Sequence, residues 1–180
     1  MVWRTPINLE LIPSDNSMSY KDMDAGQTAL PLSPHVGAFG VTRKHHIHEG
    51  VDLYCPEGTD VFAVEDGTVV NIVPFTGAHA GSDWWHNTYA VLVEGKTGVV
   101  VYGEILTTCK TGQKISAGDL IGTVKQVLKI DKGRPMSMLH LELYDHGVRD
   151  AVEWPVGLAR QSGLKDPTPY LLESIQNEKN

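Results

Sequence analysis

The chain has 180 residues, of which 41% are hydrophobic, and both values are ordinary for one globular domain. Its 15 basic and 22 acidic residues give a formal net charge of −7, so the basic footprint of a nucleic-acid-binding protein is missing. No segment has the roughly 18 consecutive apolar residues of a membrane span, and the N-terminus does not read as a signal peptide. We therefore expect no nucleic-acid partner, no membrane span, and a cytoplasmic location unless a phage or a secretion system delivers the protein. No particular oligomeric state is indicated.

Residues 1–34 are polar and rich in Pro, Ser, Asn and Asp, which predicts an irregular N-terminal arm. From about residue 35, short β-favouring runs alternate with turns that contain glycine. This spacing predicts one mostly β domain over residues 35–145, built as an antiparallel β-sandwich or barrel. The predicted strands cover residues 60–64, 67–73, 88–93, 98–106, 120–128 and 139–144.

Two stretches of the β region resemble each other, and the chain ends differently from both. Residues 58–70 and 117–124 each place a glycine before an apolar strand and then repeat Gly-Thr-Val. Two hairpin copies of this kind are typical of a barrel-sandwich hybrid, although glycine turns and Thr-Val strands also recur by chance. Residues 146–180 are predicted to be a C-terminal extension, with a short helix from about Thr168 because Asp166 and prolines precede it.

The first group of chemically interesting residues is His48 and Asp52, with Gly50 between them. On a straight strand the two side chains would lie about 13 Å apart, too far for one metal ion. A turn at Gly50 would fold the chain back and bring them together. The sequence therefore predicts a metal site only if the chain turns at Gly50.

The second group is Met138, His140 and Glu142, which share one face of a predicted strand whose other face carries leucines. Alone, this pattern favours a half-buried strand with a solvated polar face. Combined with His48 and Asp52, His140 would complete a His₂Asp zinc site with one open position, the pattern of catalytic zinc.

A third group is Tyr102 and Glu104, which alternation places on one face at the end of an apolar strand. Glu104 then lies at the rim of a cleft or is solvated at the strand end. His86 follows Trp84 and Trp85, which together could form the wall of a groove.

The segments HEGVDLYCPEGTDVFAVEDGTVV and SMLHLELYDHG together resemble the lysostaphin-type (LytM-like) zinc endopeptidases, which cut peptide crosslinks in bacterial peptidoglycan. The resemblance covers roughly residues 35–145 and the late DPTPYLL stretch. It implies a duplicated hybrid β fold, a zinc cofactor and a peptidoglycan peptide as substrate. It also implies that His48, Asp52 and His140 are the three zinc ligands, with Glu142 and Met138 beside them in the cleft. The groove wall suggested by Trp84 and Trp85 adds His86 to the candidate cleft residues.

Two positions depart from the pattern of this family. Met138 stands where the family has the first histidine of a His-x-His pair, and Glu104 stands where a Tyr-x-His-Leu motif has a catalytic histidine. Met138 can neither accept a proton nor stabilise an oxyanion. Glu104 could replace the base, and Tyr102 could donate a hydrogen bond to the oxyanion.

Three functions remain open on this basis. The first is a zinc endopeptidase that uses Glu104 as its base. The second is a non-catalytic zinc-binding module for cell-wall peptides or another protein, which the loss of both histidines favours. The third is a phosphocarrier of the sugar-phosphotransferase IIA type, suggested by PFTGAHAG and His86, but this leaves the His48–Asp52 and His140 motifs unexplained. Cys55 and Cys109 are expected to be free thiols.

Overall fold

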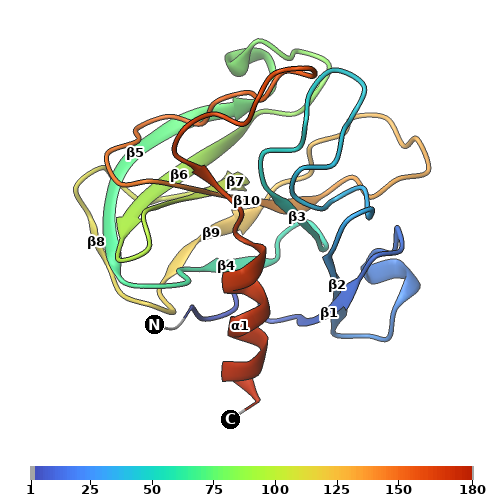
Figure 1. Ribbon diagram of the computed structural model, residues 1–180, viewed down its shortest axis with the longest axis horizontal. Coiled ribbons are helices and arrows are strands. Elements are labelled where there is room, and N and C mark those ends of the chain that lie inside the picture. Colours follow the sequence, from blue (N-terminus) through green and yellow to red (C-terminus); the bar gives the residue numbers. More distant parts are fainter. Residues whose placement is uncertain (1–2, 180) are drawn as a thin grey trace.

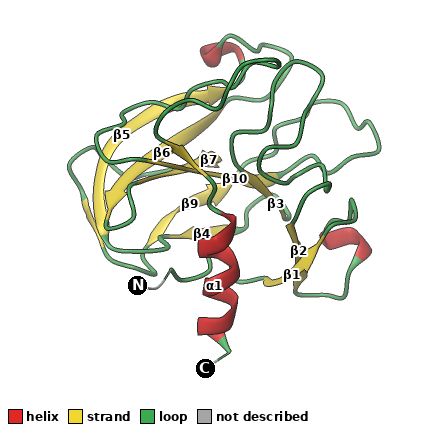
Figure 2. Ribbon diagram, viewed as in Figure 1, coloured by secondary structure: helices red, strands yellow, loops and turns green. Residues whose placement is uncertain are grey.

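Nine antiparallel strands form one curved sheet within residues 3–179, which the computed structural model of the chain describes (Figures 1 and 2). A second, parallel pair of strands and a C-terminal helix pack beside this sheet, at the end of the molecule opposite the short helical turn η2 (Ala78–Ala80) (Figure 1). The prediction of a mostly β, antiparallel fold with a short helix from Thr168 is confirmed. No helix within residues 3–179 has both the length and the apolar character needed to cross a membrane.

The elements follow one another in this order: β1 (Glu10–Ser14), η1 (Tyr20–Asp22), β2 (Gln27–Pro31), β3 (Val51–Tyr54), β4 (Asp60–Phe62), β5 (Gly67–Thr76), η2 (Ala78–Ala80), β6 (Thr88–Gly95), β7 (Val99–Leu106), β8 (Lys114–Ile115), β9 (Leu120–Val124), β10 (Met138–Tyr144), β11 (Leu164–Lys165) and α1 (Thr168–Glu178). Strand β10 is central, because it pairs with β3, β7 and β11.

The N-terminal arm is more ordered than its polar composition suggested. Strands β1 and β2 pair in parallel, so the prediction of an irregular arm is wrong for these ten residues. Trp3, Ile7, Leu11 and Leu30 are almost completely buried in the main core. These few large apolar side chains fix the arm to the domain, because burying each of them gains about 1.5–3 kcal/mol.

The central strands β6 and β7 are buried on both faces. Val100 and Tyr102 point into the main core, together with leucines of β10. Val99 and Val101 point to the opposite face, where residues from the 148–154 segment cover them. A strand that is covered on both faces has no polar side, which explains the continuous valine run at the start of β7.

The two cysteines, Cys55 and Cys109, are free, as the sequence predicted. Cys55 is buried in the main core and Cys109 is half-buried.

Candidate metal centre

Strands β3 and β10 place Asp52 and His140 side by side. The two residues are direct partners in the antiparallel register, so their side chains emerge on the same face of the sheet. His48 precedes β3, and the chain bends at Gly50 between them. A Cβ atom at Gly50 would lie 2.3 Å from the carbonyl oxygen of Leu141, so only glycine lets this bend pack against β10.

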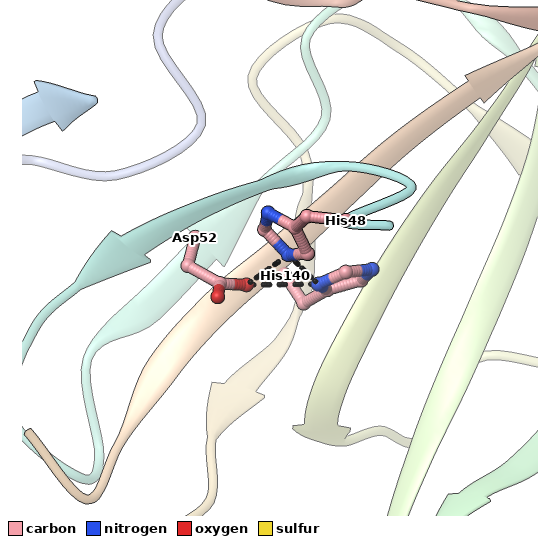
Figure 3. A group of neighbouring side chains, drawn as sticks. All are labelled: His48, Asp52 and His140. Carbon is pink, nitrogen blue, oxygen red and sulfur yellow. Dashed lines mark hydrogen bonds and ion pairs between the residues drawn. The ribbon is translucent and has the colours of Figure 1, made fainter. Parts of the chain in front are cut away.

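Three side-chain atoms of these residues converge on one point, as Figure 3 shows. Nδ1 of His140 lies 2.8 Å from Oδ1 of Asp52, and Nε2 of His48 lies 3.3 Å from each of these two atoms. All three residues are buried. The structure therefore brings together the three residues that the sequence predicted to be metal ligands, although their role as ligands stays a prediction.

The second ring nitrogen of each histidine is held by a group outside the cluster. Nδ1 of His48 lies 3.0 Å from the carbonyl oxygen of Ala38, which can only accept, so this nitrogen carries the proton and Nε2 offers its lone pair. Nε2 of His140 lies 2.8 Å from Oε1 of Glu142, whose other oxygen accepts a hydrogen bond from the hydroxyl of Tyr144. Such outer partners orient the histidine ligands of metal sites.

The charges around the cluster also favour a cation. Burial opposes the charge of Asp52, but His48 and His140 outweigh it and hold the pKa of Asp52 well below its usual value. Burial likewise opposes the charge of His140, but the carboxylates of Asp52 and Glu142 raise the pKa of His140 well above its usual value. In the metal-free protein a proton thus sits between Asp52 and His140, where a metal ion would replace it.

Two imidazole nitrogens and one carboxylate oxygen are the donor set of catalytic zinc sites that keep an open position. Within residues 3–179, His48, Asp52 and His140 form the group of metal-ligating side chains that meets the geometry of a metal site. The residues therefore fit a zinc ion.

A bulge in β7 turns Glu104 towards this cluster. Tyr102 and Ile105 both point into the main core although they are three residues apart, and the register against β6 shifts between them. The extra residue leaves Gly103 opposite His140 and puts Glu104 in the left-handed region, with φ of 65°. Because bulges re-aim side chains in this way, alternation along a regular strand does not apply here.

Glu104 is half-buried, and its carboxyl group lies close to other charged groups. Burial is the main reason that its pKa is raised to about 8, and the nearby charge of Asp52 adds to the effect. Within the described residues, its Oε2 atom is buried and has no hydrogen-bond partner.

The expectation that Tyr102 shares the cleft with Glu104 is wrong. Tyr102 is 0% exposed, and its hydroxyl accepts a hydrogen bond of 3.0 Å from the backbone N–H of Val64. The bulge separates the two side chains onto opposite faces of the sheet. Tyr102 is thus part of the core and cannot donate to an oxyanion near the cluster.

The other predicted cleft residues lie around the cluster to different degrees. Glu142 contacts His140 directly, and Met138 begins β10 on the same face. The backbone N–H of His86 donates a hydrogen bond of 2.8 Å to the carbonyl oxygen of Val127. The imidazole ring of His86 is one of the groups that lower the pKa of Glu57. His86 is not one of the three converging residues, and its place in the cleft stays a prediction.

Two further residues lie near the cluster, and the sequence motifs did not indicate either of them. Tyr54 lies two residues after Asp52 on β3, and burial and the charge of Asp52 raise the pKa of Tyr54. Strand alternation could have identified it. Arg43 donates a hydrogen bond of 2.7 Å to Oδ2 of Asp52. It comes from a loop, where no periodic pattern could have indicated its direction.

Replacing Glu142 by Ala should weaken zinc binding by about 10- to 100-fold, the usual effect of removing a carboxylate that orients a histidine ligand. The reason is that Nε2 of His140 loses its acceptor at 2.8 Å. Competition with a chromogenic chelator would measure the change. The matched control is Glu94→Ala, because Glu94 is a partly exposed carboxylate that pairs with Arg149 and not with a histidine of the cluster. Equal zinc affinity in the wild type and Glu142→Ala would contradict this prediction.

Glu104 should make the metal-free protein less stable as the pH rises from about 4.5 to about 8. The folded state keeps the proton of Glu104 over this range and the unfolded state releases it, so the free energy of unfolding falls with rising pH. Urea unfolding of chelator-treated wild type and Glu104→Gln at several pH values would measure this. The advantage of Glu104→Gln should grow with pH and level off above about pH 8. An advantage that is the same at every pH would count against the raised pKa.

An antiparallel β domain with a buried His–Asp–His group of this kind has the architecture of a metallopeptidase. The sequence model of peptidase family M23 matches residues 46–151, which is more than half of the chain. The chain therefore belongs to peptidase family M23, and the resemblance to the lysostaphin-type enzymes is confirmed. This membership also removes the phosphocarrier alternative.

Solved structures share the fold of this chain. CbpA from L. salivarius REN is 23% identical with a TM-score of 0.52, and the match covers 79% of this chain and 88% of that chain. A chain of the SpoIIQ–SpoIIIAH pore-forming complex is 20% identical with a TM-score of 0.51, covering 86% and 93%. The catalytic domain of lysostaphin from Staphylococcus simulans is 19% identical with a TM-score of 0.48, covering 76% and 89%. At these identities the likeness concerns the fold alone.

The match spans only 44% of the length of a longer lysostaphin chain. No curated protein sequence matches this chain.

Proposed function

We propose that this member of family M23 is a zinc-dependent endopeptidase that hydrolyses peptide crosslinks of peptidoglycan. The observation that carries the proposal is the convergence of Nε2 of His48, Oδ1 of Asp52 and Nδ1 of His140, with the outer nitrogen of each histidine already occupied. A zinc ion held by these atoms would act as a Lewis acid and make water more acidic at neutral pH. Membership of peptidase family M23 supports peptide hydrolysis, and the resemblance of the two sequence motifs to the lysostaphin-type enzymes supports a cell-wall peptide as the substrate.

Glu104 takes the role of general base in this proposal. It stands at a position where the family has a catalytic histidine, and the bulge directs its carboxylate towards Asp52 and His140. A base is most effective when its pKa lies near the working pH, and a value of about 8 meets that condition in the metal-free protein. The positive charge of a bound zinc ion would lower this pKa from its raised value and favour the ionised carboxylate.

A second candidate function is a zinc-stabilised module that binds cell-wall peptides or another protein without cleaving them. Met138 favours it, because this side chain replaces a catalytic histidine with a group that cannot transfer a proton. A solved neighbour of similar fold is part of a pore-forming complex, which supports a binding role for such domains.

Incubating the zinc-loaded protein with purified crosslinked muropeptides separates the two candidates. The endopeptidase should release smaller muropeptides at a rate that falls to background when zinc is removed and recovers when zinc is restored. A zinc-loaded protein that binds the muropeptides but releases no product would support the binding module instead.

A further inference from the structure

One guanidinium group lies directly beside the ligand cluster. Nη2 of Arg43 donates to Oδ2 of Asp52 at 2.7 Å and to the carbonyl oxygen of Val36 at 2.8 Å. The other oxygen of Asp52 faces the two histidines. The width of one carboxylate group therefore separates the Arg43 side chain from the point where the ligand atoms converge.

The backbone of Arg43 is also held in place. Its N–H donates to the carbonyl oxygen of His46 at 2.8 Å, and Thr42 pairs with Ile47 on either side of this turn. Both side-chain hydrogen bonds leave from the same nitrogen, Nη2. Among residues 3–179, the N–H groups on Nη1 and Nε have no hydrogen-bond acceptor, and the side chain is 32% exposed, so a substrate can reach it.

The charge of Arg43 is secure in this position. An arginine side chain is always charged in a protein, and the carboxylate of Asp52 lies 2.7 Å from its Nη2 atom. Glu104 follows Gly103, which lies directly opposite His140 in the register of β7 and β10. A permanently charged donor, the proposed base and the ligand cluster are thus neighbours.

Peptide hydrolysis needs such a donor. When water attacks, its oxygen bonds to the carbonyl carbon, one of its protons passes to the base, and the π electron pair of the carbonyl moves to the oxygen. When the C–N bond then breaks, the proton passes from the base to the leaving nitrogen. A fixed hydrogen-bond donor near the oxygen stabilises the negative charge of the tetrahedral state. Tyr102 cannot supply it, because its hydroxyl lies in the core.

We propose that Arg43 is the catalytic residue that stabilises the oxyanion, through the N–H groups not used by Asp52 and Val36. The proposal rests on the proposed peptidase function and adds an electrophilic residue to it. Arg43 would compensate for the histidines that this chain lacks at positions 104 and 138. An arginine suits the task, because its planar group can hold Asp52 on one side and a substrate oxygen on another.

The experiment compares binding of two probes to the zinc-loaded protein by calorimetry. One probe is a tetrapeptide of glycine and alanine, and the other is its phosphinic analogue, whose tetrahedral anion replaces the central amide. Arg43→Gln keeps an N–H donor for Asp52 but removes the charge. The preference is the affinity for the phosphinic probe divided by the affinity for the plain tetrapeptide. Arg43→Gln should reduce this ratio by about 100-fold, in line with the loss of one oxyanion donor. Its affinity for the plain tetrapeptide should stay within about threefold of the wild type.

Zinc affinity and turnover are measured on the same variants. Arg43→Gln should retain zinc and lose about 10²–10³ in kcat on muropeptides with little change in KM. Arg149→Ala, which breaks an exposed ion pair with Glu94, is the matched control and should change neither the zinc affinity nor the turnover on muropeptides. If Arg43→Gln does not fold, Arg43→Lys decides, because a point charge lacks the second set of donors and should reduce the preference about tenfold.

Each outcome bears on the proposal. An unchanged preference for the phosphinic probe in Arg43→Gln overturns it. A lower zinc affinity together with an equal loss of affinity for both probes also overturns it, because Arg43 would then only hold Asp52 in place. A wild type that cleaves no muropeptide but shows the preference that depends on Arg43 would leave this inference standing and contradict the proposed peptidase function.

Discussion

Replacing His48 or His140 by alanine should abolish zinc binding, from about one zinc per chain in protein purified without chelator to essentially none. Each substitution removes one of three converging ligand atoms and leaves two, too few for a tight zinc site. Metal analysis of the purified variants measures the zinc content. The same variants should also lose the rise in melting temperature that zinc produces in the wild type, because a ligand that binds only the folded state stabilises it.

His146→Ala is the matched control for this experiment. His146 is exposed, lies just beyond β10 and bonds to the carbonyl oxygen of Gly95, away from the cluster. It should keep the full zinc content and the wild-type melting temperature with zinc. If both cluster variants retain one tightly bound zinc per chain, the ion is held elsewhere and the assignment of ligands is wrong.

Replacing Glu104 by Gln should reduce turnover on muropeptides by about 10²–10⁴-fold, the usual contribution of a general base. Glutamine keeps the shape of the side chain at the bulge but cannot accept the proton. Zinc content should not change, because Glu104 is not a member of the three-residue ligand group. Initial rates at saturating substrate, together with metal analysis of the same samples, would measure both effects.

Glu94→Gln is the matched control, since Glu94 lies at the opposite end of the β6–β7 hairpin and is partly exposed. Its turnover should equal that of the wild type. Undiminished turnover in Glu104→Gln would exclude Glu104 as the base. The converse experiment restores histidine with Glu104→His and Met138→His together. If activity arises only in that double variant, the natural chain is a relative that has lost its chemistry.

Family membership and the ligand candidates could be predicted from the sequence because they depend on short motifs. The four-residue spacing of His48 and Asp52, with Gly50 between them, already required a bend, and the structure contains one. The alternation around His140 predicted that the leucines occupy one face of the strand and His140 the other. In β10 the leucines do point into the main core. In both cases the local backbone pattern determines where the side chain points, so local sequence was enough.

The position of Tyr102 could not be predicted in the same way. Alternation placed it beside Glu104, but the bulge in β7 inserts one residue and separates the two. A bulge depends on how the neighbouring strands β6, β9 and β10 pair with β7, which is a property of the whole sheet. Similarly, the order in residues 1–34 depends on a few apolar side chains that find the core, not on the polar composition of the segment.

By itself, the sequence determined the β class, the family and the three residues that converge, because each of these follows from spacing within a strand or a turn. Only the tertiary structure decided which groups surround them. Ala38, Glu142 and Arg43 reach the cluster from different segments, and each fixes one ligand through a hydrogen bond. These contacts span only 2 to 10 residues of the chain. The loop that carries Ala38 and Arg43 follows no periodic pattern, however, so its position against β3 exists only once the strands and loops have packed together.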